Sequence, residues 1–215
     1  MIVNEEAVKK VLKETEGVKL VAATKYVDAP ELDKLEALGV KYFGENRVQA
    51  FLDKYEKYHG QAQWQFIGTL QCNKVKYIID KVKLIHSVNT YKLIDEIEKQ
   101  AKKHDLVMDI LLQVNIAHEE SKHGFDAKEM DDVLNYIKDN HPHIHPRGLM
   151  MMAPNIEPEE TRKYFKATKD LLTSLQQDFP EYQLTELSMG MTNDYKIAME
   201  EGATIVRLGH ALFKD

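Results

Sequence analysis

The chain has 215 residues, of which 43% are hydrophobic, and its 29 Lys and Arg against 35 Asp and Glu give a net charge of −6. This length suits one domain with a sizeable core. The acidic balance argues against nucleic acid as the main partner, because binding to a phosphate backbone requires a basic face. Cys72 is the only cysteine, which excludes an intrachain disulfide and a cysteine-rich metal site and indicates a reducing compartment.

No apolar run approaches the roughly 18 residues of a membrane span. The N-terminal segment MIVNEEAVKKVLKE is charged and has the pattern of a helix start, unlike a signal peptide. We therefore expect a cytoplasmic protein without membrane contact.

A leading amphipathic helix is expected at residues 4–15. The segment LVAATK (20–25) is a short buried strand that ends on a lysine, and Pro30 opens a helical stretch that stops at Gly39. The same unit of a short apolar strand followed by a helix then recurs along the chain. Strands are expected near positions 20, 42, 63, 83, 108, 145, 185 and 204.

Apolar runs without period-two alternation, each followed by a helix, indicate a parallel sheet that is covered on both faces. We predict a single-domain (β/α)₈ TIM barrel over residues 1–215, with the leading N-terminal helix in front of it. An open doubly wound sheet is the alternative, but the first strand lacks the GxGxxG turn of that fold.

The stretch 187–213 (LSMGMTNDYKIAMEEGATIVRLGHALF) contains the last two predicted strands. The first is followed by the small-residue turn Ser188 to Thr192, and the second ends in Gly209 and His210. In a parallel barrel these two loops commonly form a phosphate site, because free backbone N–H groups at a helix start point at the anion.

Lys25 ends an otherwise apolar strand, so its amine would lie in the barrel mouth. Desolvation or a neighbouring cation there lowers the pKa of a lysine and exposes a nucleophilic amine that can form a Schiff base. The alternative is a lysine that merely extends from the strand end into solvent. Arg207 points to the same side of its strand as Gly209 and could reach a carboxylate or a ring nitrogen. Its alternative role is a salt bridge at the barrel rim.

A phosphate site, a lysine able to form a Schiff base and an arginine near a pyridine nitrogen together describe a pyridoxal 5′-phosphate site. A guanidinium does not give up its proton, so it would leave the pyridine nitrogen unprotonated. The cofactor would then be a weaker electron sink than it is beside an aspartate.

Seven sequence blocks in this order make the chain resemble the pyridoxal phosphate homeostasis proteins (the YggS and PROSC group), whose single domain is similar to the barrel domain of alanine racemase. The blocks are VAATK, FGENRVQ, QFIGTLQCNK, IHSVN, VNIAHEESKHGF, RGLMMMAP and the stretch 187–213. The resemblance implies that the cofactor is bound by Lys25, Asn46, Ser188, Thr192, Arg207, Gly209 and His210.

Within that set, the resemblance implies an aldimine on Lys25, Arg207 near the pyridine nitrogen and Asn46 beside the ring. The phosphate would be held by Gly209, His210 and the hydroxyls of the turn after the seventh strand. No catalytic residue and no metal ligand is implied.

The chain departs from the family pattern at three positions. Thr69 stands where the family commonly has histidine, and Thr192 stands where it commonly has serine, which keeps the hydroxyl. His210 stands where it commonly has threonine, so that a side-chain phosphate contact is in question while the backbone N–H is retained. A partly protonated imidazole there could substitute, with its pKa raised by the phosphate dianion.

Several of these residues also have a structural alternative. Asn46 and Gln49 form a capping-box-like helix start, and Thr192 is suited to cap the helix that follows it. Ser188 is equally well explained as an ordinary strand residue. Lys122 could guard the mouth or take up cofactor transiently, but a solvated loop lysine is the favoured interpretation.

The remaining signals are weak. The alternating His141, His143 and His145 would suit a metal patch, but a proline-containing loop at a strand start is favoured. Cys72 has no evident histidine partner, so a catalytic thiol is not expected. The methionines at 150–152 are predicted to fill the barrel interior.

A two-base racemase needs a second acid or base and a part that closes over the cofactor. The chain ends just after the eighth predicted strand, so we expect an open mouth. We predict a non-catalytic, monomeric carrier that buffers or delivers pyridoxal phosphate, with apo forms of cofactor-dependent enzymes as candidate recipients. The alternatives are a racemase-like enzyme of narrow substrate range that uses the cofactor, and a cofactor-free barrel enzyme acting on a phosphorylated metabolite.

Overall fold

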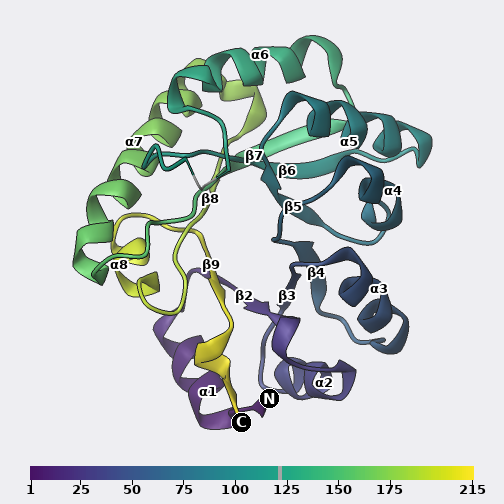
Figure 1. Cartoon of the computed structure of the whole chain (residues 1–215), viewed down its shortest axis with the longest axis vertical. Helices are drawn as coiled ribbons and strands as arrows, with labels where there is room; N and C mark the ends of the chain where they lie inside the picture. Colours follow the sequence, from purple (N-terminus) through teal and green to yellow (C-terminus); the bar gives the residue numbers. More distant parts are fainter. Residues whose placement is uncertain (121–122) are drawn as a thin grey trace.

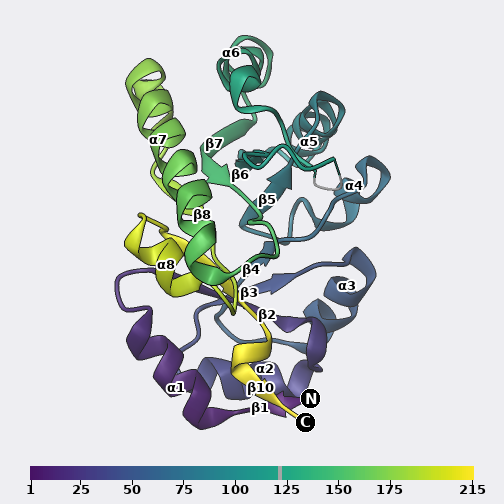
Figure 2. The same ribbon diagram turned by 60° about the vertical axis from the view of Figure 1, so that its left-hand side comes forward.

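The structure is a computed structural model that describes residues 1–120 and 123–215. Eight parallel strands close into a barrel in chain order, from β2 to β9, and the last strand pairs with the first. The predicted (β/α)₈ barrel is therefore confirmed (Figures 1 and 2). The barrel strands are β2 (Lys19–Ala23), β3 (Tyr42–Glu45), β4 (Gln63–Phe66), β5 (Leu84–Val88), β6 (Met108–Gln113), β7 (Ile144–Met150), β8 (Glu186–Ser188) and β9 (Ile205–Leu208).

Helices surround this barrel (Figure 1). They bury one apolar face against the strands, as α5 does with Leu93, Ile94, Ile97 and Ala101. The helices are α1 (Glu5–Glu14), α2 (Ala29–Ala37), α3 (Val48–Lys57), α4 (Val75–Ile78), α5 (Tyr91–Lys103), α6 (Met130–Asn140), α7 (Arg162–Asp178) and α8 (Tyr195–Glu200). None of the helices in the described part of the chain has the length and apolar character needed to cross a membrane.

The core has two parts, because successive residues of a strand point to opposite faces of the sheet. A small cluster that includes Leu84, Met150 and Ile205 fills the barrel interior, and a large cluster lies between the strands and the helices. Met151 belongs to the outer cluster. The prediction that all three consecutive methionines fill the interior is therefore wrong for Met151, and strand alternation is the reason.

The two ends of the chain pair with each other, as Figure 2 shows. Strand β1 (Ile2–Val3) runs antiparallel to β10 (Phe213–Lys214), and the N–H of Asn4 donates to the carbonyl oxygen of Leu212 at 2.9 Å. Asn4 also caps α1 by accepting a hydrogen bond from the N–H of Ala7. The N-terminal segment therefore holds the segment that follows β9.

The three alternating histidines between the end of α6 and the first residues of β7 each contact a different carboxylate. The pairs are His141 with Asp95 at 2.8 Å, His143 with Glu98 at 2.7 Å and His145 with Asp109 at 3.3 Å. Within residues 1–120 and 123–215, no group of three His, Cys, Asp or Glu side chains is arranged to hold a metal ion. The favoured structural interpretation of these histidines fits this arrangement.

Candidate functional site

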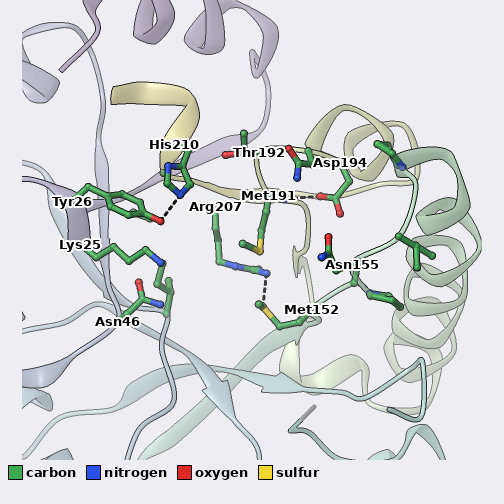
Figure 3. A pocket seen from close by; sticks show the side chains of 18 residues that line it. Lys25, Tyr26, Asn46, Met152, Asn155, Met191, Thr192, Asp194, Arg207 and His210 are labelled. Atoms are coloured by element: carbon green, nitrogen blue, oxygen red, sulfur yellow. Dashed lines mark hydrogen bonds between the residues drawn. The ribbon is translucent and has the colours of Figure 1, made fainter. Parts of the chain in front are cut away.

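A cavity of about 520 Å³ opens at the carboxyl ends of the barrel strands. Its lining comes from the segments that follow β2, β3, β4, β7, β8 and β9. Six of the seven predicted cofactor residues line it, namely Lys25, Asn46, Thr192, Arg207, Gly209 and His210 (Figure 3). Ser188 is not among the lining residues.

Lys25 lies just beyond the end of β2, in the short 3₁₀ helix Thr24–Tyr26. Its side chain is exposed, and Figure 3 shows it directed into the cavity. Its Nζ lies 4.8 Å from the centroid of the Tyr26 ring. The amine is therefore placed in the mouth as predicted, but the burial that was expected around it is not present.

A buried ion pair lies beneath this part of the rim. Glu45 is 0% exposed and Lys54 is 9% exposed, and Lys54 Nζ donates to Glu45 Oε2 at 2.7 Å. The same Nζ donates to the carbonyl oxygen of Thr24 at 2.6 Å, and the Thr24 hydroxyl donates to Glu45 Oε2 at 2.8 Å. The other carboxylate oxygen accepts from the N–H of Asn46 at 3.0 Å. One ion pair thus fixes the residue before Lys25 and the backbone of Asn46.

The sequence pattern does not predict this ion pair. Two signals were available: Glu45 is a carboxylate at the end of an apolar strand, and Lys54 follows the buried Phe51 by three residues on the inward face of α3. Neither signal names the partner, because the two residues lie on different elements.

Asn46 does not form the predicted capping box. Helix α3 begins at Val48 with Arg47 as its N-cap, and no side chain caps it, while Gln49 Nε2 donates to Asp53 at 3.0 Å. The Oδ1 atom of Asn46 is buried and has no hydrogen-bond partner among the described residues. Because a buried acceptor without a donor costs about 1–3 kcal/mol, this atom marks a position where a bound ligand could donate.

The turn after β8 also differs from the prediction. Helix α8 begins at Tyr195 with Asp194 at the N-cap position, so Thr192 does not cap it. Asp194 Oδ1 accepts from the N–H of Met191 at 2.7 Å. Burial raises the pKa of Asp194, although that N–H and the charge of Arg207 act in the opposite direction.

Thr192 and Asn193 line the cavity between Met191 and Asp194. In the part of the chain that the structure describes, neither residue makes a hydrogen bond through its backbone N–H or its side chain. Two N–H groups, a hydroxyl and an amide are therefore available to an anion at this side of the cavity.

Gly209 and His210 lie at the rim beside Tyr26. The Tyr26 hydroxyl lies 2.8 Å from His210 Nε2, and the two ring centroids are 4.4 Å apart. A Cβ atom on Gly209 would lie 2.9 Å from Cε2 of Tyr26, so a larger residue there would need the Tyr26 ring to shift. The sequence did not single out Tyr26, whose contact with His210 joins opposite ends of the chain.

Arg207 lies on β9 and is only 5% exposed. Its Nη1 donates to the hydroxyl of Ser188, and its Nη2 donates to the carbonyl oxygen of Met151 at 3.1 Å. Burial lowers the pKa of Arg207 to about 10, while the carboxylate of Asp194 opposes this shift. The guanidinium therefore stays protonated at neutral pH.

Ser188 is 0% exposed and lies beneath the cavity. Its hydroxyl contacts Arg207 and His86, which places it away from the predicted phosphate position. Thr69 is exposed and is not among the lining residues, and Lys122 lies outside the described residues.

The profile of the family described as "Alanine racemase, N-terminal domain" matches residues 4–215. The chain is 43% identical over 199 residues to a pyridoxal phosphate homeostasis protein of Aquifex aeolicus, covering 92% of this chain and 86% of that protein. It is 33% identical over 213 residues to the protein of the same name from Haemophilus influenzae, covering 97% and 90%. It is similar in structure to PipY of Synechococcus elongatus with PLP bound, with a TM-score of 0.90, 30% identity and coverage of 98% and 99%.

Proposed function

Because the chain belongs to the family of the alanine racemase N-terminal domain and, within it, to the pyridoxal phosphate homeostasis proteins, we propose that it binds pyridoxal 5′-phosphate in the cavity at the barrel mouth. The observation that carries this proposal is the convergence of an exposed amine, a buried guanidinium and unbonded N–H groups in one cavity. The similarity to PipY, which was solved with PLP, supports it.

The residues present fit this cofactor. When bound, pyridoxal phosphate supplies an aldehyde that condenses reversibly with amines and a ring that withdraws electrons. Lys25 is the amine that would hold it, and Arg207 would face the ring nitrogen without giving up its proton. The unpartnered Oδ1 of Asn46 would gain a donor.

We propose that the phosphate is held at the side of the cavity opened by the turn after β8. Thr192 and Asn193 carry unbonded donors there, and Gly209 and His210 line the same cavity on the segment after the neighbouring strand β9. Backbone N–H groups in such turns bind anions well because they are fixed before the anion arrives.

We further infer that the protein holds and releases the cofactor and does not turn over a substrate. Lys25 is exposed, so a competing amine can reach it from solvent. A tyrosine and a histidine that line the cavity, Tyr26 and His210, are hydrogen-bonded to each other and lie at the rim. The relatives' name, homeostasis protein, supports the same role.

The test of the carrier role is an assay for turnover. Protein loaded with pyridoxal phosphate, incubated with single L- and D-amino acids, is expected to produce no more racemised or decarboxylated product than an equal concentration of the free cofactor. Chiral chromatography measures the products. Robust turnover that disappears in Lys25→Ala would overturn the carrier proposal and favour the racemase-like enzyme.

His210→Ala is expected to weaken cofactor retention modestly, by about two- to fivefold. The variant keeps the backbone N–H but removes the imidazole and its contact with Tyr26. Equilibrium dialysis at about pH 6 and about pH 8 measures the effect. Equal retention by variant and wild type at both pH values would show that the imidazole does not take part in binding.

The proposal has four further parts. The protein delivers the cofactor to apo forms of other enzymes, acts as a single domain over residues 1–215, is monomeric and is located in the cytoplasm. The single cysteine supports the cytoplasmic location, and the net charge of −6 argues against nucleic acid as the main partner.

A further inference from the structure

Four polar side chains form a connected set beneath the cavity, and only one of them has a role in the proposed function. Gln65 lies on β4, His86 on β5, Ser188 on β8 and Arg207 on β9. His86 and Ser188 are 0% exposed, Gln65 is 4% exposed and Arg207 is 5% exposed. Buried polar groups are costly unless they are hydrogen-bonded, so this set calls for a physical explanation.

Strand alternation places the set inside the barrel. His86 follows Leu84 by two residues, and Arg207 follows Ile205 by two, so each shares the face of an interior apolar residue. The polar set therefore lies in the barrel interior, between strands that are not all neighbours, and it reaches the cavity through Arg207.

The hydrogen bonds within the set have one consistent direction. The Gln65 Oε1 atom only accepts, so His86 Nε2 carries the hydrogen in their 2.6 Å contact. In a neutral imidazole Nδ1 is then an acceptor, and the Ser188 hydroxyl donates to it at 2.9 Å. The oxygen of Ser188 has lone pairs left, and it accepts from Nη1 of Arg207.

The opposite charge state of His86 would break this order. A protonated imidazole donates from both nitrogens, so that Ser188 would face two donors and its own hydrogen would have no acceptor. Burial, together with the nearby charge of Arg207, holds the pKa of His86 well below its usual range. A neutral imidazole with its hydrogen on Nε2 is the state that satisfies all three contacts.

We propose that Gln65, His86 and Ser188 are positioning residues that orient the guanidinium of Arg207 toward the cavity through a one-way chain of hydrogen bonds. The contact of Nη2 with the Met151 carbonyl fixes the other side of the guanidinium. The guanidinium of Arg207 is then oriented toward the cavity before any ligand binds. Arg207 therefore loses less rotamer freedom on binding than an arginine without these contacts would. The proton stays on Arg207, because its pKa is about 10 while burial holds the pKa of His86 well below its usual range. The identity of the ligand rests on the proposed function, whereas the chain of hydrogen bonds does not depend on it.

The first test needs no cofactor. Nitrogen NMR of protein labelled in histidine is expected to show His86 as a neutral Nε2–H tautomer between about pH 6 and about pH 8. In Ser188→Ala the unprotonated Nδ1 loses its donor, and its resonance is expected to move downfield. In Thr168→Val, which removes another buried hydroxyl, here bonded to the carbonyl oxygen of Tyr164 in α7, the resonance should stay in place. A protonated His86 or an Nδ1–H tautomer in the wild type would overturn the proposal.

The second test measures binding. Ser188→Ala is expected to weaken affinity for pyridoxal phosphate by about tenfold, because Arg207 loses a fixed acceptor. Thr168→Val should stay within about twofold of wild type, and Ser188→Thr, which keeps a hydroxyl, should bind more tightly than Ser188→Ala. Far-UV circular dichroism confirms that each variant is folded. Wild-type affinity in folded Ser188→Ala would overturn the positioning role.

The two proposals can fail separately. If the wild-type protein does not bind pyridoxal phosphate, the proposed function is wrong. The NMR result on His86 still decides the direction of the hydrogen bonds between Gln65, His86 and Ser188. If binding is present and folded Ser188→Ala keeps the affinity of the wild type, the positioning role is wrong and the function stands.

Discussion

Replacing Lys25 with alanine is expected to abolish the visible absorption band that forms when wild-type protein is mixed with pyridoxal phosphate. It should also weaken retention of the cofactor by at least about 100-fold, because covalent attachment is lost and only polar contacts are left. Lys25 is the lysine that lines the cavity within the described residues. Absorbance spectra recorded before and after gel filtration measure both effects.

Two variants control this experiment. Lys25→Arg keeps a positive charge in the mouth but has no nucleophilic amine, so it should also lose the band. Lys9→Ala removes an exposed lysine of α1, outside the cavity, and should behave as wild type. A band of wild-type intensity in Lys25→Ala would mean that another amine holds the cofactor, and it would contradict the assignment of Lys25.

Replacing Lys54 with methionine is expected to lower the free energy of unfolding by about 3–5 kcal/mol, since it leaves the carboxylate of Glu45 buried without its partner. The side chains of Lys54 and Glu45 are 11% and 1% exposed, so solvent cannot take over the lost interaction. The Thr24 carbonyl loses a donor as well. Urea unfolding followed by circular dichroism measures the change.

The double variant Glu45→Leu with Lys54→Met separates stability from function. Removing both charges is expected to recover much of the lost stability, because an apolar pair of similar volume can replace a buried ion pair. The affinity of the double variant for pyridoxal phosphate should nevertheless be lower than that of the wild type, since no carboxylate holds Thr24 and the N–H of Asn46. Lys57→Met on the same helix is the exposed control. A change below about 1 kcal/mol in Lys54→Met would contradict the role given to the ion pair.

The barrel could be predicted because its signals are local. Each strand is a short apolar run and each helix has an apolar face, so the order of the elements follows from patterns a few residues long. Parallel strands bring their carboxyl ends to one rim. For that reason Lys25, after the first barrel strand, and Arg207, on the last, could be placed in one cavity although they lie far apart along the chain.

The partners of individual side chains could not be predicted in the same way. The alternatives offered for Asn46 and Thr192 were caps of the nearest helix, but α3 and α8 begin later than expected. Helix starts are the least certain features of a sequence pattern, because several residues in a row can serve as caps. The Tyr26 contact with His210 and the pairing of β1 with β10 depend on segments that meet only after the barrel closes.

Hydrophobic periodicity and the residues at strand ends are enough to specify the eight-stranded barrel, the rim that carries the site and the two charged groups, Lys25 after β2 and Arg207 on the neighbouring β9, that line the cavity there. The direction of each polar atom depends on packing, since a buried donor or acceptor must find a partner among whatever side chains the closed barrel brings near. That requirement turns Ser188 away from the cavity toward Arg207 and His86, and ties Glu45 to Lys54. The Oδ1 atom of Asn46, a residue that lines the cavity, is left buried with no partner among the described residues.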